Sequence, residues 1–329
     1  MERHQIALYL LALLVGGVVG MVAGSGTAGA AGHLVNPVLG LLLYVTFLGI
    51  PLRRALSTLR DLRFLATVAM VNFVAVPLVV WLLTRPIAGD EVLLVGVLFV
   101  LLAPCIDYVI VFTGLAGGAA DRLLAAAPLL MAAQMLLLPV YLWAFLGSEV
   151  LGGFDAGPFV EAFVVLIVLP LCAAAATQAI PGRAGDAVRE VMAGLMVPLM
   201  MLTLALVVAS QIAGVDRQLS WLVQVVPVYV AFVVVMTALG WLAGRPCAGT
   251  PGALDVPARR AVVFTGVTRN SLVVLPLVLA LPAGYELAPL VVVTQTLVEL
   301  VAMVVLVRTV PLMIPSRPTA RPPVPAGHG

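Results

Sequence analysis

The chain has 329 residues, of which 63% are hydrophobic and only 10% are charged, and its mean hydropathy is +1.20. A soluble globular protein does not need so large an apolar fraction over this length, so soluble enzymes and soluble binding domains are excluded. The net charge of +2 is too small to indicate a nucleic-acid partner, although all 17 basic residues are arginines. We therefore expect an all-α polytopic protein whose surroundings are the lipid bilayer.

Ten apolar stretches are long enough to cross a membrane, because a hydrocarbon core of about 30 Å needs roughly 20 helical residues. They cover residues 6–24, 34–52, 64–84, 92–116, 123–147, 158–180, 191–213, 220–243, 260–281 and 287–311. The first is long for the apolar part of a signal peptide and favours a spanning helix, although the Ala/Gly-rich residues after it leave cleavage open. Residues 313–329 are rich in proline and are predicted to form a disordered tail.

The arginines predict the orientation, because loops on the cytoplasmic side carry the excess of positive charge. With the N-terminus inside, 14 arginines lie on the inner side, Arg85 and Arg217 lie outside, and Arg269 lies within a span. Both termini are therefore predicted to be cytoplasmic, in a multi-pass protein of the plasma membrane.

The chain also repeats itself at one nearly constant offset. Residues 81–86 (WLLTRP) recur as residues 241–246 (WLAGRP), and Ala-Pro-Leu at 127–129, followed by Gln134, recurs at 288–290, followed by Gln295. Two matches in the same ordinal stretch of each half predict a duplication into five-helix repeats, residues 1–150 and 151–312. An odd number of spans in each repeat inverts the second repeat relative to the first, as in many secondary transporters.

The ninth stretch carries an arginine, Arg269, inside an apolar run. A charged side chain at bilayer depth costs at least roughly 2.5–3.5 kcal/mol on insertion scales, so it usually faces a partner or a wet cavity. Gly266 and Pro276 bracket it, and helix breakers at this depth need protein or water to satisfy the backbone they release. The stretch is predicted to be a discontinuous helix that forms half of a binding site.

The fourth stretch is its predicted counterpart, because Pro104, Asp107 and Gly114 interrupt it in a similar way. Interrupted segments at corresponding positions of two repeats point to a transporter's binding site. The offset of the repeat places Arg269 opposite Tyr108, so Asp107 and Arg269 are expected to pair where the two broken helices cross. The alternative is that Arg269 is a structural clamp and never contacts the substrate.

The candidate site residues are polar or reactive side chains in these two stretches and on the helices that follow them. The candidate substrate or ion contacts are Cys105, Asp107, Thr265, Thr268, Arg269, Asn270 and Ser271. The candidates for supporting the crossing or for coupling are Gln134, Gln295 and Glu299, for which packing between helices is the alternative. Helix breaks are expected at Pro104, Gly114, Gly266 and Pro276.

Two short motifs carry a resemblance to a known family. Ala103-Pro104-Cys105 in the fourth stretch and Arg269-Asn270 in the ninth resemble the arsenite efflux permeases of the bile acid/arsenite/riboflavin transporter superfamily, over nearly the whole chain to about residue 311. The resemblance implies a core domain and a panel domain, with the fourth and ninth helices unwound and crossing in the core. It also implies a role for Cys105 in arsenite passage.

The sequence departs from those permeases at one place. They resemble one another in an acidic residue shortly after the Arg-Asn pair, where this chain has residues 272–274, Leu-Val-Val. Our hypothesis is that Asp107 takes over that coupling role from the other side of the crossing. Glu299 is the alternative proton carrier.

These patterns predict a secondary transporter that exports arsenite or a related metalloid, with protons as the expected coupling ion and uncoupled transport as the alternative. A fixed cation such as Arg269 repels sodium, and a soft thiolate at Cys105 suits As(III), although one cysteine allows only a transient contact. The alternative transporter takes a small organic anion, coupled to sodium or protons, with Arg269 as the carboxylate contact. A membrane sensor or scaffold is a third possibility. No phosphate-binding loop, zinc spacing or Ser/His/Asp arrangement indicates an enzyme or a cofactor.

Overall fold

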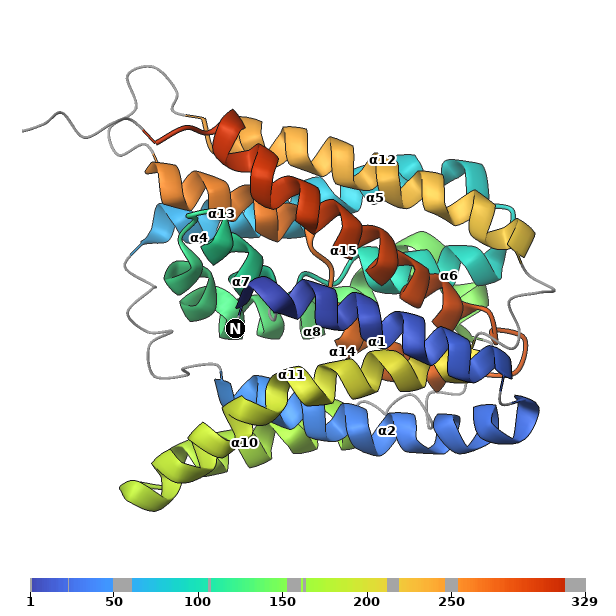
Figure 1. The fold of residues 1–329 in the computed structure, drawn as a ribbon. Helices are drawn as coiled ribbons and strands as arrows, with labels where there is room; N and C mark the ends of the chain where they lie inside the picture. Colours follow the sequence, from blue (N-terminus) through green and yellow to red (C-terminus); the bar gives the residue numbers. More distant parts are fainter. Residues whose placement is uncertain are drawn as a thin grey trace, which may run out of the picture.

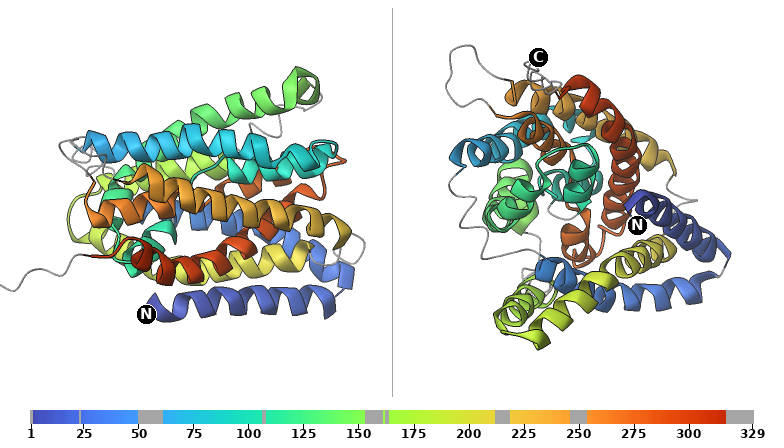
Figure 2. Two further views of the ribbon diagram at one scale, coloured as in Figure 1. Left: turned by 90° about the horizontal axis from the view of Figure 1, so that it is seen from above. Right: turned by 60° about the vertical axis from the view of Figure 1, so that its left-hand side comes forward.

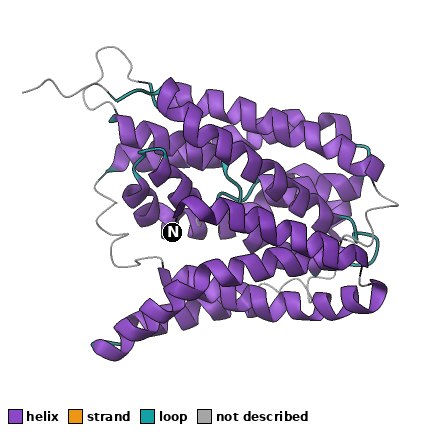
Figure 3. Ribbon diagram, viewed as in Figure 1, coloured by secondary structure: helices purple, strands orange, loops and turns teal. Residues whose placement is uncertain are grey.

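The computed structural model describes residues 2–22, 24–49, 61–105, 108–152, 161, 164–211, 219–245 and 254–316. Every regular element in these ranges is a helix (Figure 3). Five of the helices are long and apolar enough to cross a membrane: Leu62–Leu83, Ala120–Gly147, Gly185–Leu206, Val223–Ala243 and Ala288–Met313. The prediction of an all-helical polytopic membrane protein is confirmed.

Four helices pack together at one side of the molecule, and we call them the panel group (Figure 1). They are α1 (Glu2–Val22), α2 (Gly24–Gly49), α10 (Leu169–Ala179) with the π-helical turn η3 (Val164–Val168) before it, and α11 (Arg183–Gln211). The amide of Gln178 donates to the carbonyls of Phe47 and Leu48 at 3.2 and 3.1 Å. These bonds satisfy carbonyls that the end of α2 would otherwise leave unpaired, and so fix α10 against α2.

Two panel helices begin earlier than the hydropathy predicts. The second and seventh stretches were expected to start at residues 34 and 191, whereas α2 starts at Gly24 and α11 at Arg183. Packing of α2 along α11 offsets the helix penalty of about 1 kcal/mol for each glycine near the start of α2. The first turns of α11 are polar, with an ion pair between Arg189 and Asp186 at 2.5 Å, so a scan for apolar residues misses them.

The remaining helices form the core group, which meets the panel group where α11 contacts α15 and α2 contacts α14 (Figure 2). In chain order the core group comprises α4 (Leu62–Met70), the π-helical turn η1 (Val71–Ala75), α5 (Val76–Leu83), the 3-10 turn η2 (Arg85–Ile87), α6 (Glu91–Leu101), α7 (Tyr108–Leu115), α8 (Ala120–Gly152), α12 (Leu219–Ala243), α13 (Val256–Val267), α14 (Ser271–Leu279) and α15 (Ala288–Met313). Helix α8 bends at Gly147, where φ is +78°. The fourth and ninth predicted stretches are each divided into two helices, α6 and α7 in one and α13 and α14 in the other.

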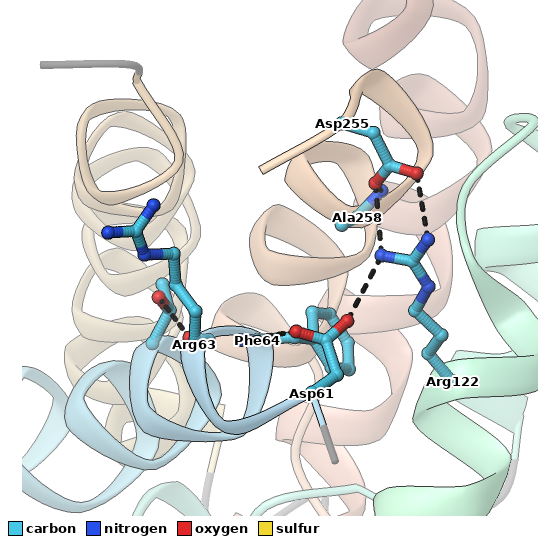
Figure 4. A network of polar contacts seen from close by, with 7 residues as sticks. Asp61, Arg63, Phe64, Arg122, Asp255 and Ala258 are labelled. Carbon is cyan, nitrogen blue, oxygen red and sulfur yellow. Dashed lines mark hydrogen bonds and ion pairs between the residues drawn. The ribbon is translucent and has the colours of Figure 1, made fainter. Parts of the chain in front are cut away.

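Arg122 on α8 links the starts of two other core helices (Figure 4). The side chain of Asp61 accepts from the amide of Phe64 and caps α4, and Asp255 accepts from the amide of Ala258 and caps α13. Arg122 lies 3.3 Å from Asp61 and 2.8 Å from Asp255. Because all three side chains are partly exposed, we expect each ion pair to contribute no more than about 1 kcal/mol.

The environment of Arg260 differs from the one that the sequence predicts. Arg260 was counted among the charges of the cytoplasmic loops, yet its side chain is buried and donates to the carbonyls of Ala116 at 2.9 Å and Ile314 at 2.8 Å. It also donates to the hydroxyl of Ser316 at 3.0 Å. Arg260 thus joins the end of α7 to the end of α15 and holds the first residues of the predicted tail, while residues 317–329 lie outside the described ranges.

The repeated tryptophan and arginine pair has the same geometry in both halves. The guanidinium of Arg85 lies 3.8 Å from the ring centroid of Trp81, and that of Arg245 lies 4.2 Å from the ring centroid of Trp241. Each pair stacks at the end of its helix, where a cation over an aromatic face is favourable. The sequence match at an offset of 160 therefore corresponds to a matching local structure.

In the core group, α12 and α13 approach each other closely at Gly240. A methyl group on Gly240 would lie 2.8 Å from the Cα of Val263, a backbone atom that cannot rotate away. We expect Gly240→Ala to destabilise the protein by about 1–3 kcal/mol through overpacking. Thermal unfolding of the purified protein measures this, with Gly194→Ala as the control because a methyl group there meets nothing within 4 Å. Equal midpoints for the two variants would contradict the close packing.

Candidate functional site

The two interrupted segments meet in the core group through their backbones. Between α6 and α7, and between α13 and α14, the chain is unwound, and Pro104 and Arg269 form an isolated antiparallel bridge. The amide of Cys105 donates to the carbonyl of Thr268 at 3.2 Å, and the amide of Asn270 donates to the carbonyl of Ala103 at 2.8 Å. Each break thus satisfies backbone groups that the other releases, which is what allows non-helical chain at this depth.

Arg269 fills the space between the ends of the two half-helices that enter the crossing. Its side chain is fully buried and donates to the carbonyls of Thr265 at 2.6 Å and Gly266 at 2.9 Å, in the last turn of α13. It also donates to the carbonyl of Leu101, the last residue of α6, at 3.3 Å. The C-terminal end of a helix carries unpaired carbonyls and partial negative charge. The guanidinium of Arg269 therefore satisfies carbonyls, and balances partial negative charge, at the ends of both α6 and α13.

Two further residues hold this guanidinium, and the sequence analysis missed both. Asn72, in the π-helical turn η1, accepts from Arg269 at 2.8 Å and donates to the hydroxyl of Thr265 at 3.1 Å. The ring centroid of Phe232 on α12 lies 5.5 Å from the guanidinium carbon of Arg269, within reach of a cation–π contact. The signal that points to Asn72 is that it is a lone amide in the apolar run 64–84. The repeat offset of 160 maps Asn72 onto Phe232.

Glu299 on α15 contacts the backbone of the crossing. Its carboxylate accepts the backbone amide of Arg269 at 2.8 Å, and the same oxygen accepts a bond from the side chain of Gln295, one turn earlier. Both residues are buried. Glu299 is thus a buried carboxylate that binds the backbone of the unwound segment directly.

Several buried polar atoms have no hydrogen-bond partner among the described residues, and two of them, on Asn270 and Ser271, belong to the second break. The atoms include Thr113 Oγ1, Gln134 Oε1, Thr203 Oγ1, Asn270 Nδ2, Ser271 Oγ and Gln295 Oε1. Nearly all buried polar groups in proteins are hydrogen-bonded, so a group of exceptions indicates water, an ion or a ligand. At the second break, Asn270 Nδ2 is a donor and Ser271 Oγ can donate or accept, and both atoms are uncharged.

A small cavity joins two of these atoms across the boundary between the groups. Ser271 at the start of α14, Thr203 on α11 of the panel group and Thr296 on α15 line it, and its volume is about 10 Å³. A cavity needs roughly 10–15 Å³ by this measure to hold one water molecule. This cavity therefore has room for one water molecule at most.

Comparison with models of protein families gives a match. The sequence profile of the sodium bile acid symporter family matches residues 36–214, more than half of the chain. The chain belongs to the sodium bile acid symporter family. No curated protein matches it. Because members of this family are membrane transporters and not enzymes, the apolar helices of this chain are those of a multi-pass transporter.

The family match includes the first interrupted segment and ends before the second. It runs from α2 to the end of α11 and so contains Pro104 and Cys105, whereas residues 256–279 lie beyond it. The position of Arg269 at the crossing therefore comes from the structure and not from the match.

Most of the predicted site residues lie together in this member of the symporter family. Cys105, Thr265, Thr268, Arg269, Asn270, Gln295 and Glu299 are joined to the crossing by the bonds described above, and Ser271 follows it directly. The hydroxyl of Thr268 donates to the carbonyl of Phe264 at 2.7 Å. Gln134 is buried on α8. Asp107, and hence its expected pairing with Arg269, lies outside the described residues.

Two of the four expected helix breaks are wrong. Pro104 is in the unwound segment and Gly266 is in the last turn of α13, but Gly114 lies within α7 and Pro276 lies within α14. The helices separate instead where the two segments can exchange backbone hydrogen bonds, because an unpaired backbone group is costly away from water. Among the described residues, no group of three His, Cys, Asp or Glu side chains could hold a metal ion.

Proposed function

We propose that this symporter-family protein exports arsenite, or a related metalloid, from the cytoplasm through the crossing. The observation that carries the proposal is the position of Cys105, whose backbone amide is part of the bridge. Close in sequence to the other half of that bridge are uncharged polar atoms of Asn270 and Ser271 that have no partner among the described residues. Arsenite is a neutral, hydroxylated and thiophilic solute at neutral pH, so both features suit it.

The transport mechanism that we propose is alternating access in ten spans. Its basis is a pair of inverted five-helix repeats, residues 1–150 and 151–312, supported by the matching Trp81–Arg85 and Trp241–Arg245 stacks and by a broken helix in each half. The panel group and the core group move relative to each other around the crossing. Arginine placement supports a plasma-membrane orientation with both termini in the cytoplasm.

Proton antiport is the proposed coupling. Glu299 supports it, since a buried carboxylate bonded to the backbone of Arg269 experiences any rearrangement of the crossing. Asp107 remains the second candidate carrier. The fixed positive charge of Arg269 opposes sodium binding nearby.

The alternative cargo is a small organic anion, coupled to sodium or protons, and the family match favours it. Arg269 was the expected carboxylate contact. Its guanidinium instead donates to three backbone carbonyls and to Asn72, so an incoming carboxylate would have to displace bonds that hold the crossing together. This engagement of Arg269 favours the neutral metalloid over the anion.

Arsenite accumulation in a hypersensitive cell tests the proposal. Cells that express the protein are expected to accumulate less arsenite than cells without it, and Cys105→Ala should remove most of the difference. The control is Cys172→Ala, because Cys172 is exposed on α10 of the panel group. Membrane levels of the variants are matched by immunoblotting. Unchanged accumulation with correctly inserted protein would overturn arsenite export and leave the organic anion as the leading cargo.

A further inference from the structure

The outer surface of the core group carries an apolar groove between α12 and α15. Its volume is about 540 Å³, and its lining is entirely aliphatic, including Val230, Val234, Leu297, Val301 and Val305. The side chains of Val234, Val301 and Val305 are more than half exposed. Valine has a stiff side chain, so the groove is expected to keep its shape when nothing fills it.

The position of the groove restricts what can occupy it. Helices α12 and α15 are both long and apolar enough to span a membrane, and the lining residues lie well inside both spans. The groove therefore faces the hydrocarbon region, where an aliphatic surface gains from close contact with another hydrocarbon chain and not from exclusion of water.

A positive charge lies beyond one end of the groove. Arg308 follows Val301 and Val305 on α15 at helical spacings of seven and three residues, which places it on the same face. It is exposed, and within the described ranges it forms no ion pair with a carboxylate. Helices α12 and α15 end on the same side of the molecule (Figure 1). The stacked Trp241 and Arg245 at the end of α12 therefore lie on the same side of the molecule as Arg308.

We propose that this groove binds one acyl chain of an anionic phospholipid, whose headgroup phosphate contacts Arg308. Charge complementarity selects the lipid over the apolar face of a second copy of the chain, because a buried interface would have to cover the exposed arginine. A tryptophan near a membrane boundary and a basic residue beside a cleft between spanning helices are typical of headgroup contacts.

The groove also lies directly behind the crossing. Phe232, which faces Arg269, is flanked in the sequence of α12 by Val230, Val233 and Val234 of the lining. Glu299, which binds the backbone of Arg269, lies between Val298 and Val301 of the lining on α15. A lipid in the groove would therefore brace the two helices whose inward faces hold Arg269, without touching the transport path.

Native mass spectrometry of the full-length protein, extracted from vesicles of phosphatidylglycerol and phosphatidylcholine, tests the site. The wild type is expected to retain phosphatidylglycerol about fivefold better than phosphatidylcholine, the preference that one arginine near the headgroups supplies. Arg308→Gln should remove the preference, and Val301→Trp, which fills the groove, should remove retention of both lipids. Val223→Trp, at an exposed position of α12 outside the lining, is the control and should retain lipid normally.

Two outcomes would overturn the proposal. One is lipid retention that neither Arg308→Gln nor Val301→Trp changes while both variants keep the wild-type melting temperature. The other is a wild-type dimer without bound lipid that Val301→Trp converts to a monomer, because the groove would then accept a second copy of the chain. This lipid test does not depend on the cargo, so its failure would not contradict arsenite export, and the failure of arsenite export would not contradict the lipid site.

Discussion

Arg269→Ala is expected to destabilise the folded protein by about 3–5 kcal/mol, the range for removing one member of a buried charged network. The substitution removes the donor from carbonyls at the ends of α6 and α13 and from Asn72, none of which can reach water. Thermal unfolding in detergent measures the loss. Arg269→Lys should be intermediate, because an ammonium keeps the charge but lacks the planar fork that spans several acceptors.

Arg183→Ala is the matched control for this loss of stability. Arg183 is exposed at the start of α11, and removing an exposed arginine usually changes stability by no more than about 0.5 kcal/mol. If Arg269→Ala kept the wild-type melting temperature and lost only transport, the arginine would be a substrate contact and the clamp would be refuted.

Glu299→Gln is expected to abolish the dependence of arsenite transport on a proton gradient. The amide preserves the shape of the side chain and an acceptor for the backbone of Arg269, but it cannot carry a proton. Exchanging a charge-assisted bond for a neutral one costs about 1.5 kcal/mol, so we expect the rate to fall about tenfold. Proteoliposomes loaded with arsenite and subjected to an imposed pH gradient provide the measurement.

Two companion variants make the coupling experiment decisive. Glu190→Gln removes an exposed acid from α11 and should transport like the wild type. Asp107→Asn tests the other candidate carrier. If only Asp107→Asn removes the dependence on the gradient, the carrier is Asp107, and if the wild type itself ignores the gradient, proton antiport is wrong.

The crossing could be predicted from the sequence because a polar residue at bilayer depth has a large free-energy cost, and that cost is recognisable from the residue and its apolar neighbours in the chain alone. An arginine, a proline and an asparagine in apolar runs are visible without any knowledge of the partner, and the repeat offset relates one run to the other. The observed bridge pairs Pro104 with Arg269. The sequence could not locate the breaks to the residue, since they depend on which backbone groups can pair across space. Gly114 and Pro276 are therefore inside helices.

The partners of Arg269 were harder to predict for a related reason. Asn72 is 197 residues away from Arg269 in the chain, and a single amide in an apolar run is equally compatible with ordinary packing between helices. The burial of Arg260 was missed because arginines at the ends of apolar runs are usually exposed. Its partners are backbone carbonyls, which every residue carries and no side-chain pattern reveals.

The bridge at the crossing has a consequence for how this architecture evolves. Both of its hydrogen bonds join main-chain groups, from Cys105 to Thr268 and from Asn270 to Ala103. The side chains at these four positions can therefore be exchanged while the two segments stay linked. A lineage built on such a crossing can acquire a new cargo through substitutions that leave the scaffold intact, so divergent specificities can arise within one fold.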